Sequence, residues 1–231
     1  MYQPSLKTKR NGLPIITNNE LDVLGERLVS DFSPPATIIP QEIDIDRFVI
    51  NYLHMQQDFQ YLSHCGVYLG LTVFQNTDFI PVFDPDLRIA KFVHEDASTV
   101  VIDNSILKDK TEHRYRFTMG HEASHFILHS SFFLNNIGTS EEHYIRCRAD
   151  YSTNAHANDR WSDAIRAEQQ ANRLSSAILM PRCAVGILLS RTPNRGQSQW
   201  TEKAVNLMSS VFNVSPTAAL YRLHNLGFVD N

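Results

Sequence analysis

The pentad His121-Glu122-Ala123-Ser124-His125 constrains the fold of this chain more than any other feature. Residues four apart lie one turn apart on the same face of an α-helix, so a helix brings the two imidazoles together. Apolar residues flank the pentad, with Phe117 and Met119 before it and residues 126–128 after it, which indicates a buried helix. We therefore expect a helix from about Arg114 or Thr118 to His129 that directs both imidazoles at one point, where they can bind a cation.

The hydrophobic pattern elsewhere predicts an α+β fold, in which helices pack against one small mixed or antiparallel sheet. A capping box from Thr17 to Glu20 starts a first helix, and the proline pair after Ser33 ends it. Three short segments rich in β-branched and aromatic residues indicate strands at residues 67–74, 79–83 and 98–103. Further helices are expected from about residue 44, at 162–180 and, as a pair, at 201–228.

We expect this chain to have three parts. Residues 1–40 form a helical lead-in, residues 41–181 form the core, and residues 182–231 form a pair of helices that resembles a helix-turn-helix. Within the core, residues 130–161 are polar and show little periodicity, which predicts a long loop. Loops of that length inside a compact domain commonly act as lids or binding segments, or are mobile.

The residues around the pentad suggest the parts of a catalytic zinc site, which has three protein ligands and one open position. Glu122 lies beside the two histidines, where it can take a proton from a metal-bound water. Leu128 and Ser131 occupy the positions of the glycine and third histidine in the short extended form of this motif, so the third ligand comes from elsewhere. Glu168 is the best candidate, although it could also be a solvated glutamate on a helix face. Asn172, one turn further on, is placed to hydrogen-bond a ligating histidine.

Two blocks of the sequence, residues 116–129 and 168–181, resemble the ImmA/IrrE family of metallo-endopeptidases. In that family a Phe-Thr pair leads into the zinc-binding helix, and a later helix reads approximately Glu-x-x-Ala-Asn before a Leu-Met-Pro ending. The resemblance implies a zincin-like fold with one Zn2+ per chain. It also implies that His121 and His125 are zinc ligands, that Glu122 is the general base and that Glu168 is the third ligand.

Several alternatives remain open at this stage. Ser124 stands where the family often has glycine, which is a small-for-small change. His129 could be a fourth ligand, a helix-end histidine or a partner of a ligating histidine. Manganese or iron could replace zinc. The predicted loop contains competing ligands, namely Glu141, Glu142, His143, Cys147, Asp150 and His156. The donors that could stabilise an oxyanion are Arg114, His143, Tyr144 and Tyr151.

The resemblance implies an endopeptidase that hydrolyses a peptide bond in a protein substrate, a helix-turn-helix transcriptional repressor, in the cytoplasm. A second hypothesis is a regulatory or toxin-like module that keeps the zincin scaffold but only binds a partner. A third is a DNA-binding regulator that uses the terminal helix pair. That helix pair offers only Arg222 and His224 as base or phosphate contacts, so we do not expect direct nucleic-acid binding.

Charge and composition agree with these expectations. Residues 41–181 contain 12 Lys and Arg against 19 Asp and Glu, and so acidic a body would repel a phosphate backbone. Residues 182–231 contain five basic against two acidic residues. No apolar run approaches the length of a membrane span, and no apolar stretch follows the first ten residues as in a signal peptide. Three widely spaced cysteines also fit a reducing cytoplasm.

Overall fold

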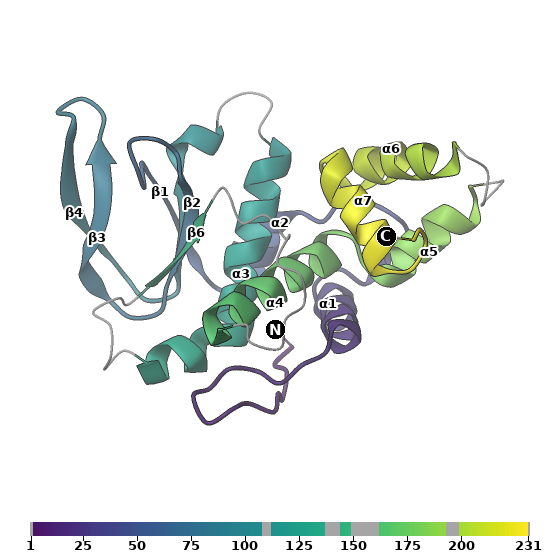
Figure 1. Cartoon of the computed structure of the whole chain (residues 1–231), viewed down its shortest axis with the longest axis horizontal. Helices are drawn as coiled ribbons and strands as arrows, with labels where there is room; N and C mark the ends of the chain where they lie inside the picture. Colours follow the sequence, from purple (N-terminus) through teal and green to yellow (C-terminus); the bar gives the residue numbers. More distant parts are fainter. Residues whose placement is uncertain (1, 108–111, 137–143, 149–161, 193–198, 231) are drawn as a thin grey trace.

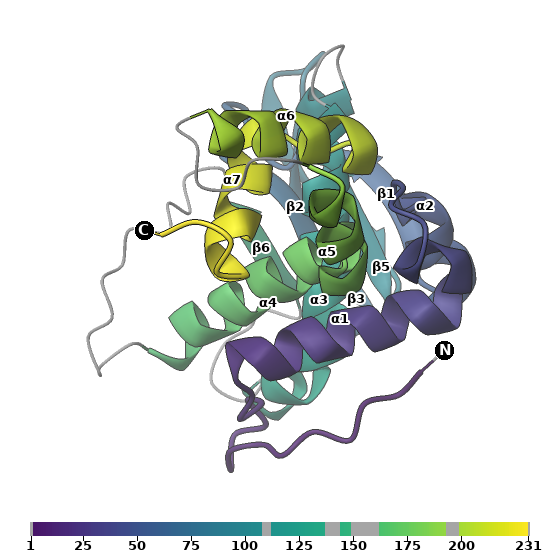
Figure 2. The same cartoon turned by 90° about the vertical axis from the view of Figure 1, so that its right-hand side faces the viewer.

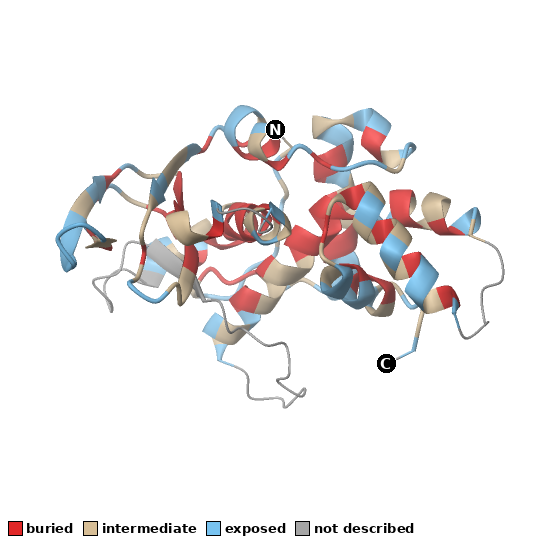
Figure 3. Cartoon of the chain, turned by 90° about the horizontal axis from the view of Figure 1, so that it is seen from above, coloured by how far each residue is buried: buried red, intermediate tan, exposed pale blue. Residues whose placement is uncertain are grey.

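A helix that carries the pentad lies at the centre of the molecule, between a sheet and a group of helices (Figure 1). This computed structural model describes residues 2–107, 112–136, 144–148, 162–192 and 199–230. The central helix, α3 (Glu112–Asn136), packs against the sheet on one side and against α4 (Asp163–Leu179) on the other. Buried residues concentrate around this centre (Figure 3). The α+β fold predicted from the sequence is therefore confirmed.

A four-stranded mixed sheet supports α3. Its strands, in spatial order, are β1 (Gln56–Gln60), β5 (Thr99–Asp103), β2 (Tyr68–Val73) and β6 (Tyr144–Arg148). β1 runs parallel to β5, whereas β2 runs antiparallel to both β5 and β6. All five residues of β5 are buried, as expected for an inner strand covered on both faces. The sheet thus gives α3 a rigid surface.

A separate hairpin covers the sheet on the side away from α3 (Figure 1). Its strands are β3 (Thr77–Asp84) and β4 (Ile89–Glu95), which pair antiparallel. Ile80 and Val82 point inward and form an apolar cluster with Leu71, Val73 and Val101 of the sheet. The opposite face of the hairpin is exposed, since alternate residues of a strand point to opposite faces.

The helix α3 extends beyond the end predicted at His129. The prediction of a loop over residues 130–161 was therefore wrong for residues 130–136, which are helical, and for residues 144–148, which form a strand. Phe132 packs on Leu13, and Phe133 stacks on Phe74 with ring centroids 5.0 Å apart. These tertiary contacts stabilise two further turns of α3, which the periodicity of the sequence did not predict. Residues 144–148 form β6 through pairing with β2, which is far away in the sequence.

On the far side of α3, α1 (Asn18–Phe32) packs against α4 (Figure 2). The predicted capping box is present, because Thr17 and Glu20 bond each other's backbone amides. A Cβ on Gly25 would lie 2.6 Å from Ala177 Cβ, so glycine allows the two helices their close approach. After η1 (Pro34–Thr37), a short helical segment follows from Ile45, formed by α2 (Ile45–Arg47) and the π-helical η2 (Phe48–Tyr52). Ser162 caps α4, close to the start expected for this helix.

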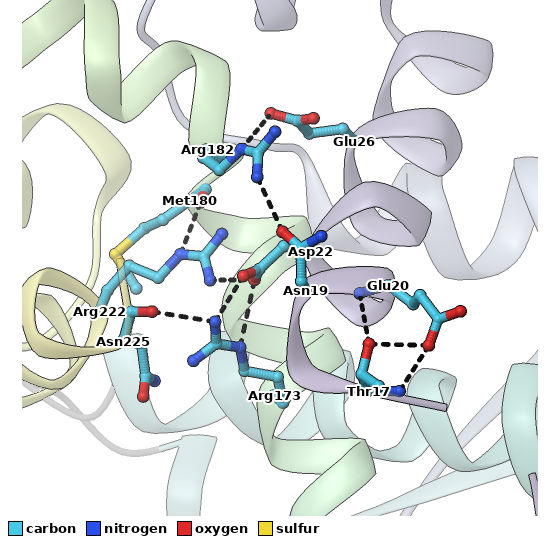
Figure 4. Close-up of polar contacts among 10 residues, drawn as sticks. All are labelled: Thr17, Asn19, Glu20, Asp22, Glu26, Arg173, Met180, Arg182, Arg222 and Asn225. Atoms are coloured by element: carbon cyan, nitrogen blue, oxygen red, sulfur yellow. Dashed lines mark hydrogen bonds and ion pairs between the residues drawn. The ribbon is translucent and has the colours of Figure 1, made fainter. Parts of the chain in front are cut away.

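The C-terminal helices are fixed to the core by buried arginines. These helices are α5 (Arg182–Ser190), α6 (Trp200–Phe212) and α7 (Pro216–Asn225). Arg222 is fully buried, donates to the Met180 carbonyl at 3.0 Å and pairs with Asp22 of α1 (Figure 4). Arg173 of α4 pairs with the same carboxylate. The predicted helix pair is confirmed, and Arg222 is not available to contact a phosphate.

The main apolar cluster draws residues from all three parts that the sequence suggested, for example Leu28, Met119 and Phe212. The division at residues 40 and 181 stays a prediction. Among the described residues, the strands β1, β4 and β6 and the helix α5 had no counterpart in the prediction. Among the described residues no single helix is long and apolar enough to span a membrane. The pair α4 and α5, with a bend of 50° between them, reaches that length and composition only when the two helices are taken together.

Candidate metal centre

Three buried side chains meet between α3 and α4. His121 Nε2 and His125 Nε2 lie 3.0 Å apart on consecutive turns of α3. Glu168 of α4 places its Oε2 3.3 Å from His121 Nε2 and its Oε1 3.4 Å from His125 Nε2. Each of the three side chains is at least 95% buried. The structure therefore brings together the three residues that the sequence singled out as ligands.

The spacing of these donors fits a metal ion. Zinc bonds nitrogen and oxygen ligands at roughly 2.0–2.2 Å, so donors around a tetrahedral ion lie about 3.3 Å apart. One ligand atom from each of His121, His125 and Glu168 can be chosen so that all lie within 4.8 Å of one another. Among the residues that the structure describes, this is the one group of His, Cys, Asp or Glu side chains with that geometry. Two imidazoles and a carboxylate are also the donor set of zinc hydrolases.

A second set of side chains orients the histidines. His121 Nδ1 lies 2.9 Å from Asn172 Oδ1, the contact expected for an amide that holds a ligating histidine. His125 Nδ1 lies 3.0 Å from His129 Nδ1, and His129 Nε2 lies 2.9 Å from Gln170 Oε1. His129 is thus in the middle of α3 rather than at a helix end, and both of its ring nitrogens are engaged by side chains other than Glu168.

Glu122 lies on the sheet side of the same helix. Thr72 of β2 donates a hydrogen bond of 2.6 Å to Glu122 Oε2, and Glu122 Oε1 is buried without a partner in the part of the chain that is described. A Cβ on Gly70 would lie 3.0 Å from that Oε1 and 2.7 Å from Thr118 Cγ2. Glycine at this position therefore allows β2 to lie directly against the carboxylate.

Burial controls the ionisation of the site. It raises the pKa of Glu122 to about 7, against the lowering effects of His121 and of the Thr72 hydrogen bond. It lowers the pKa of His125, and it lowers the pKa of His129 to about 3, so both imidazoles are neutral at pH 7. Burial also acts to raise the pKa of Glu168, but its contacts with the His121 and His125 imidazoles outweigh burial and place this pKa below its usual value. Neutral imidazoles beside a carboxylate are the protonation states that a metal requires.

The structure describes only some of the competing ligands and oxyanion donors that the sequence suggested. Arg114 lies on α3 and is exposed. The competing ligands Glu141, Glu142, His143, Asp150 and His156, and the oxyanion candidate Tyr151, lie outside the described residues. Cys147 and Tyr144 belong to β6, of which only the backbone is described. The candidate oxyanion donors therefore stay untested.

Sequence reasoning missed three residues that shape this site. Gly70 and Thr72 lie about 50 positions before the pentad on a strand, and their role depends on how β2 packs against α3. Gln170 lies two residues after Glu168, and its proximity to that candidate ligand was the available signal. Side chains near a ligand on the same helix commonly orient the other ligands of a metal site.

A buried His-His-Glu cluster on two packed helices, with a glutamate beside it, defines a zincin-like class of metal-binding protein. The model of the peptidase M78 family, described as the IrrE N-terminal-like domain, matches residues 105–224. Since this match covers more than half of the chain, the chain belongs to that family.

The chain was also compared with solved structures and with curated proteins. A solved structure of a Mycobacterium tuberculosis transcriptional regulator aligns with 93% of this chain at 12% sequence identity, with a TM-score of 0.46. The aligned chain spans 48% of that regulator. A comparison with curated proteins gave no match.

Proposed function

We propose that this protein is a zinc-dependent endopeptidase that hydrolyses a peptide bond in a protein substrate. The observation that carries this proposal is the convergence of His121, His125 and Glu168 at ligand spacing, with Glu122 beside them. Membership of the peptidase M78 family supports a metallopeptidase-like function. We assign the metal to the three converging residues, one ion per chain, and assign Asn172 to holding His121.

Zinc held by these residues would supply a Lewis acid that polarises a carbonyl and acidifies a water molecule. The chain itself supplies the proton acceptor, Glu122, whose Oε1 has no hydrogen-bond partner among the described residues. Thr72 holds the other carboxylate oxygen at 2.6 Å, so the acceptor atom keeps one orientation. A pKa of about 7 lets Glu122 accept a proton and release it again near neutral pH.

The substrate that we propose is a helix-turn-helix transcriptional repressor in the cytoplasm. The resemblance of residues 116–129 and 168–181 to the ImmA/IrrE family supports this substrate class. A protein substrate, rather than DNA, also agrees with the burial of Arg222, the main basic residue of α7.

The test is a cleavage assay with the zinc-loaded protein and purified helix-turn-helix proteins from the same genome. Mass spectrometry detects the new chain ends, and Glu122→Gln is the matched control, because it keeps the shape of the side chain and removes the base. We expect a discrete cleavage in the wild type and a loss of at least about 100-fold in the variant. Binding of a partner without cleavage by either protein would instead support the non-hydrolytic module.

A further inference from the structure

A chain of hydrogen bonds connects the candidate metal centre to the N-terminal segment. His125 Nδ1 contacts His129 Nδ1 at 3.0 Å, and His129 Nε2 contacts Gln170 Oε1 at 2.9 Å. Gln170 Nε2 then donates to the backbone carbonyl of Pro14 at 3.0 Å. His125 and His129 are both at least 99% buried. Three side chains from two helices thus form a chain of hydrogen bonds that ends at one backbone oxygen.

The Pro14 carbonyl determines the direction of every bond in this chain, because a carbonyl oxygen only accepts. Gln170 must turn its NH2 group toward Pro14, so its Oε1 accepts from His129 Nε2. His129 then carries its proton on Nε2 and accepts at Nδ1. His125 must therefore carry its proton on Nδ1, which leaves the lone pair of His125 Nε2 directed at Glu168 and His121.

The segment that supplies this carbonyl is held firmly in place. Residues 7–15 form a small turn closed by the bonds Ile15 N to Lys7 O and Lys9 N to Leu13 O, both 2.8 Å. Leu13 is fully buried against Phe132 of α3.

Two further contacts fix the same turn on both helices. Lys9 and Asn11 both bind the carboxylate of Asp163 at the start of α4, at 2.5 and 2.8 Å. Gly12 has φ +89° and its missing Cβ would lie 2.8 Å from the Ser131 carbonyl, so the turn also lies directly on the backbone of α3. The carbonyl is accordingly fixed relative to both α3 and α4.

We propose that His129 and Gln170 are positioning residues that hold His125 in the one tautomer able to bind a metal through Nε2, and that the 7–15 turn is part of the metal centre. This inference rests on the proposed metal site. His121 differs, because its partner Asn172 could present either end of its amide, whereas the His125 chain ends on a group with one polarity.

The experiment compares Gln170→Met with Gln169→Met. Methionine keeps the length and volume of glutamine but neither donates nor accepts a comparable hydrogen bond, and Gln169 is the adjacent, partly exposed residue of the same helix. Zinc affinity is measured by competition with a chelator. We expect the dissociation constant to rise about 10- to 100-fold in Gln170→Met and to stay within twofold of the wild type in Gln169→Met.

The second readout needs no metal. Long-range 15N–1H spectra of the metal-free protein at pH 8 should show His125 protonated on Nδ1 in the wild type and a mixture of tautomers in Gln170→Met. Gln170→Glu, which keeps an acceptor for His129 Nε2, should restore the wild-type tautomer if Gln170→Met loses it. Should Gln170→Met fold poorly, Gln170→Glu and the wild-type spectrum still decide whether His125 has one tautomer.

Two results would overturn this inference. One is wild-type zinc affinity in Gln170→Met, and the other is a wild-type His125 protonated on Nε2. Neither result touches the proposed peptidase function, which fails instead if the wild type binds zinc and cleaves no protein.

Discussion

The Thr72 hydroxyl acts directly on the charge of Glu122. Its hydrogen bond of 2.6 Å lowers the pKa of this carboxyl, while burial raises it, and the balance lies at about 7. The active form of a general base is the ionised one, so activity should fall as the pH drops below this pKa. In the proposed mechanism, a single uncharged side chain on β2 thereby helps to set the working pH range of the site.

We predict that Thr72→Val moves the acidic limb of the kcat/KM profile upward by about one pH unit. The variant keeps the side-chain volume and removes the hydrogen bond that favours the carboxylate, so the pKa of Glu122 rises further. Thr99→Val is the control, because Thr99 is also buried in the sheet and its hydroxyl has no hydrogen-bond partner among the described residues. A profile that stays in place in Thr72→Val would contradict this role of Thr72.

At the scale of elements, the hairpin of β3 and β4 is linked to the sheet through a carboxyl group whose pKa is raised. Glu95, at the end of β4, is 7% exposed and hydrogen-bonds Asp58 of β1. Burial and the nearby Asp58 raise the pKa of Glu95 from 4.5 to about 7. Between these two values the folded protein binds a proton that the unfolded chain has lost, so the free energy of unfolding falls as the pH rises.

Glu95→Gln should remove this dependence. We expect the melting temperature of the wild type to fall between pH 5 and pH 8, and the variant to show a smaller fall and to exceed the wild type at pH 8. Thermal unfolding monitored by circular dichroism over that range measures the effect, with the exposed Glu202→Gln as a control for the substitution. Parallel curves for Glu95→Gln and wild type would show that Glu95 is not protonated in the folded state.

How far the sequence predicted these elements depended on how local their causes are. The helix α1 begins at a capping box, and α4 begins at Ser162 and ends before Pro181, so short-range signals located both. The strands β1 and β6 lack such signals, because their pairing with β5 and β2 is non-local. The last turns of α3 likewise depend on Phe132 and Phe133, which pack on distant residues.

In the candidate site, too, local features could be predicted from the sequence and features that depend on tertiary packing could not. The spacing of His121 and His125 is a property of one helix, and so it could be read directly from the sequence. Glu168 was a candidate from its place on a predicted helix, but only the family resemblance implied that it is a ligand, because the packing of α4 on α3 has no local signature. Thr72 and Pro14 reach the site only through tertiary structure, and no pattern in the sequence indicated either one.

At the scale of the whole molecule, the C-terminal helices belong to the same core as the metal-centre helices. Arg222 of α7 pairs with Asp22 of α1, and Arg173 of α4 shares that carboxylate. Arg116 of α3 donates to the carbonyl groups of Ile43 and Asn213 at 2.9 and 3.0 Å. Charged side chains on four helices thereby connect the tail, the lead-in helix, α3 and α4.

Arg222→Ala should therefore destabilise the whole fold. It removes one partner of the buried Asp22 carboxylate, leaves the Met180 carbonyl without its donor and opens a cavity, which together cost about 3–5 kcal/mol. Urea unfolding measures this loss, with the exposed Arg191→Ala as the matched control. A loss below about 1 kcal/mol would mean that α7 is not required by the core.

The most direct test of the proposed metal centre is the metal content of the purified protein. Elemental analysis and native mass spectrometry measure it in the wild type and in Glu168→Ala. We predict one zinc ion per chain in the wild type and its loss, or a much weaker retention, in the variant. Unchanged zinc in Glu168→Ala would place the third ligand elsewhere. A wild-type protein that takes up no metal even when zinc is supplied would contradict the assignment of His121, His125 and Glu168 as a metal centre.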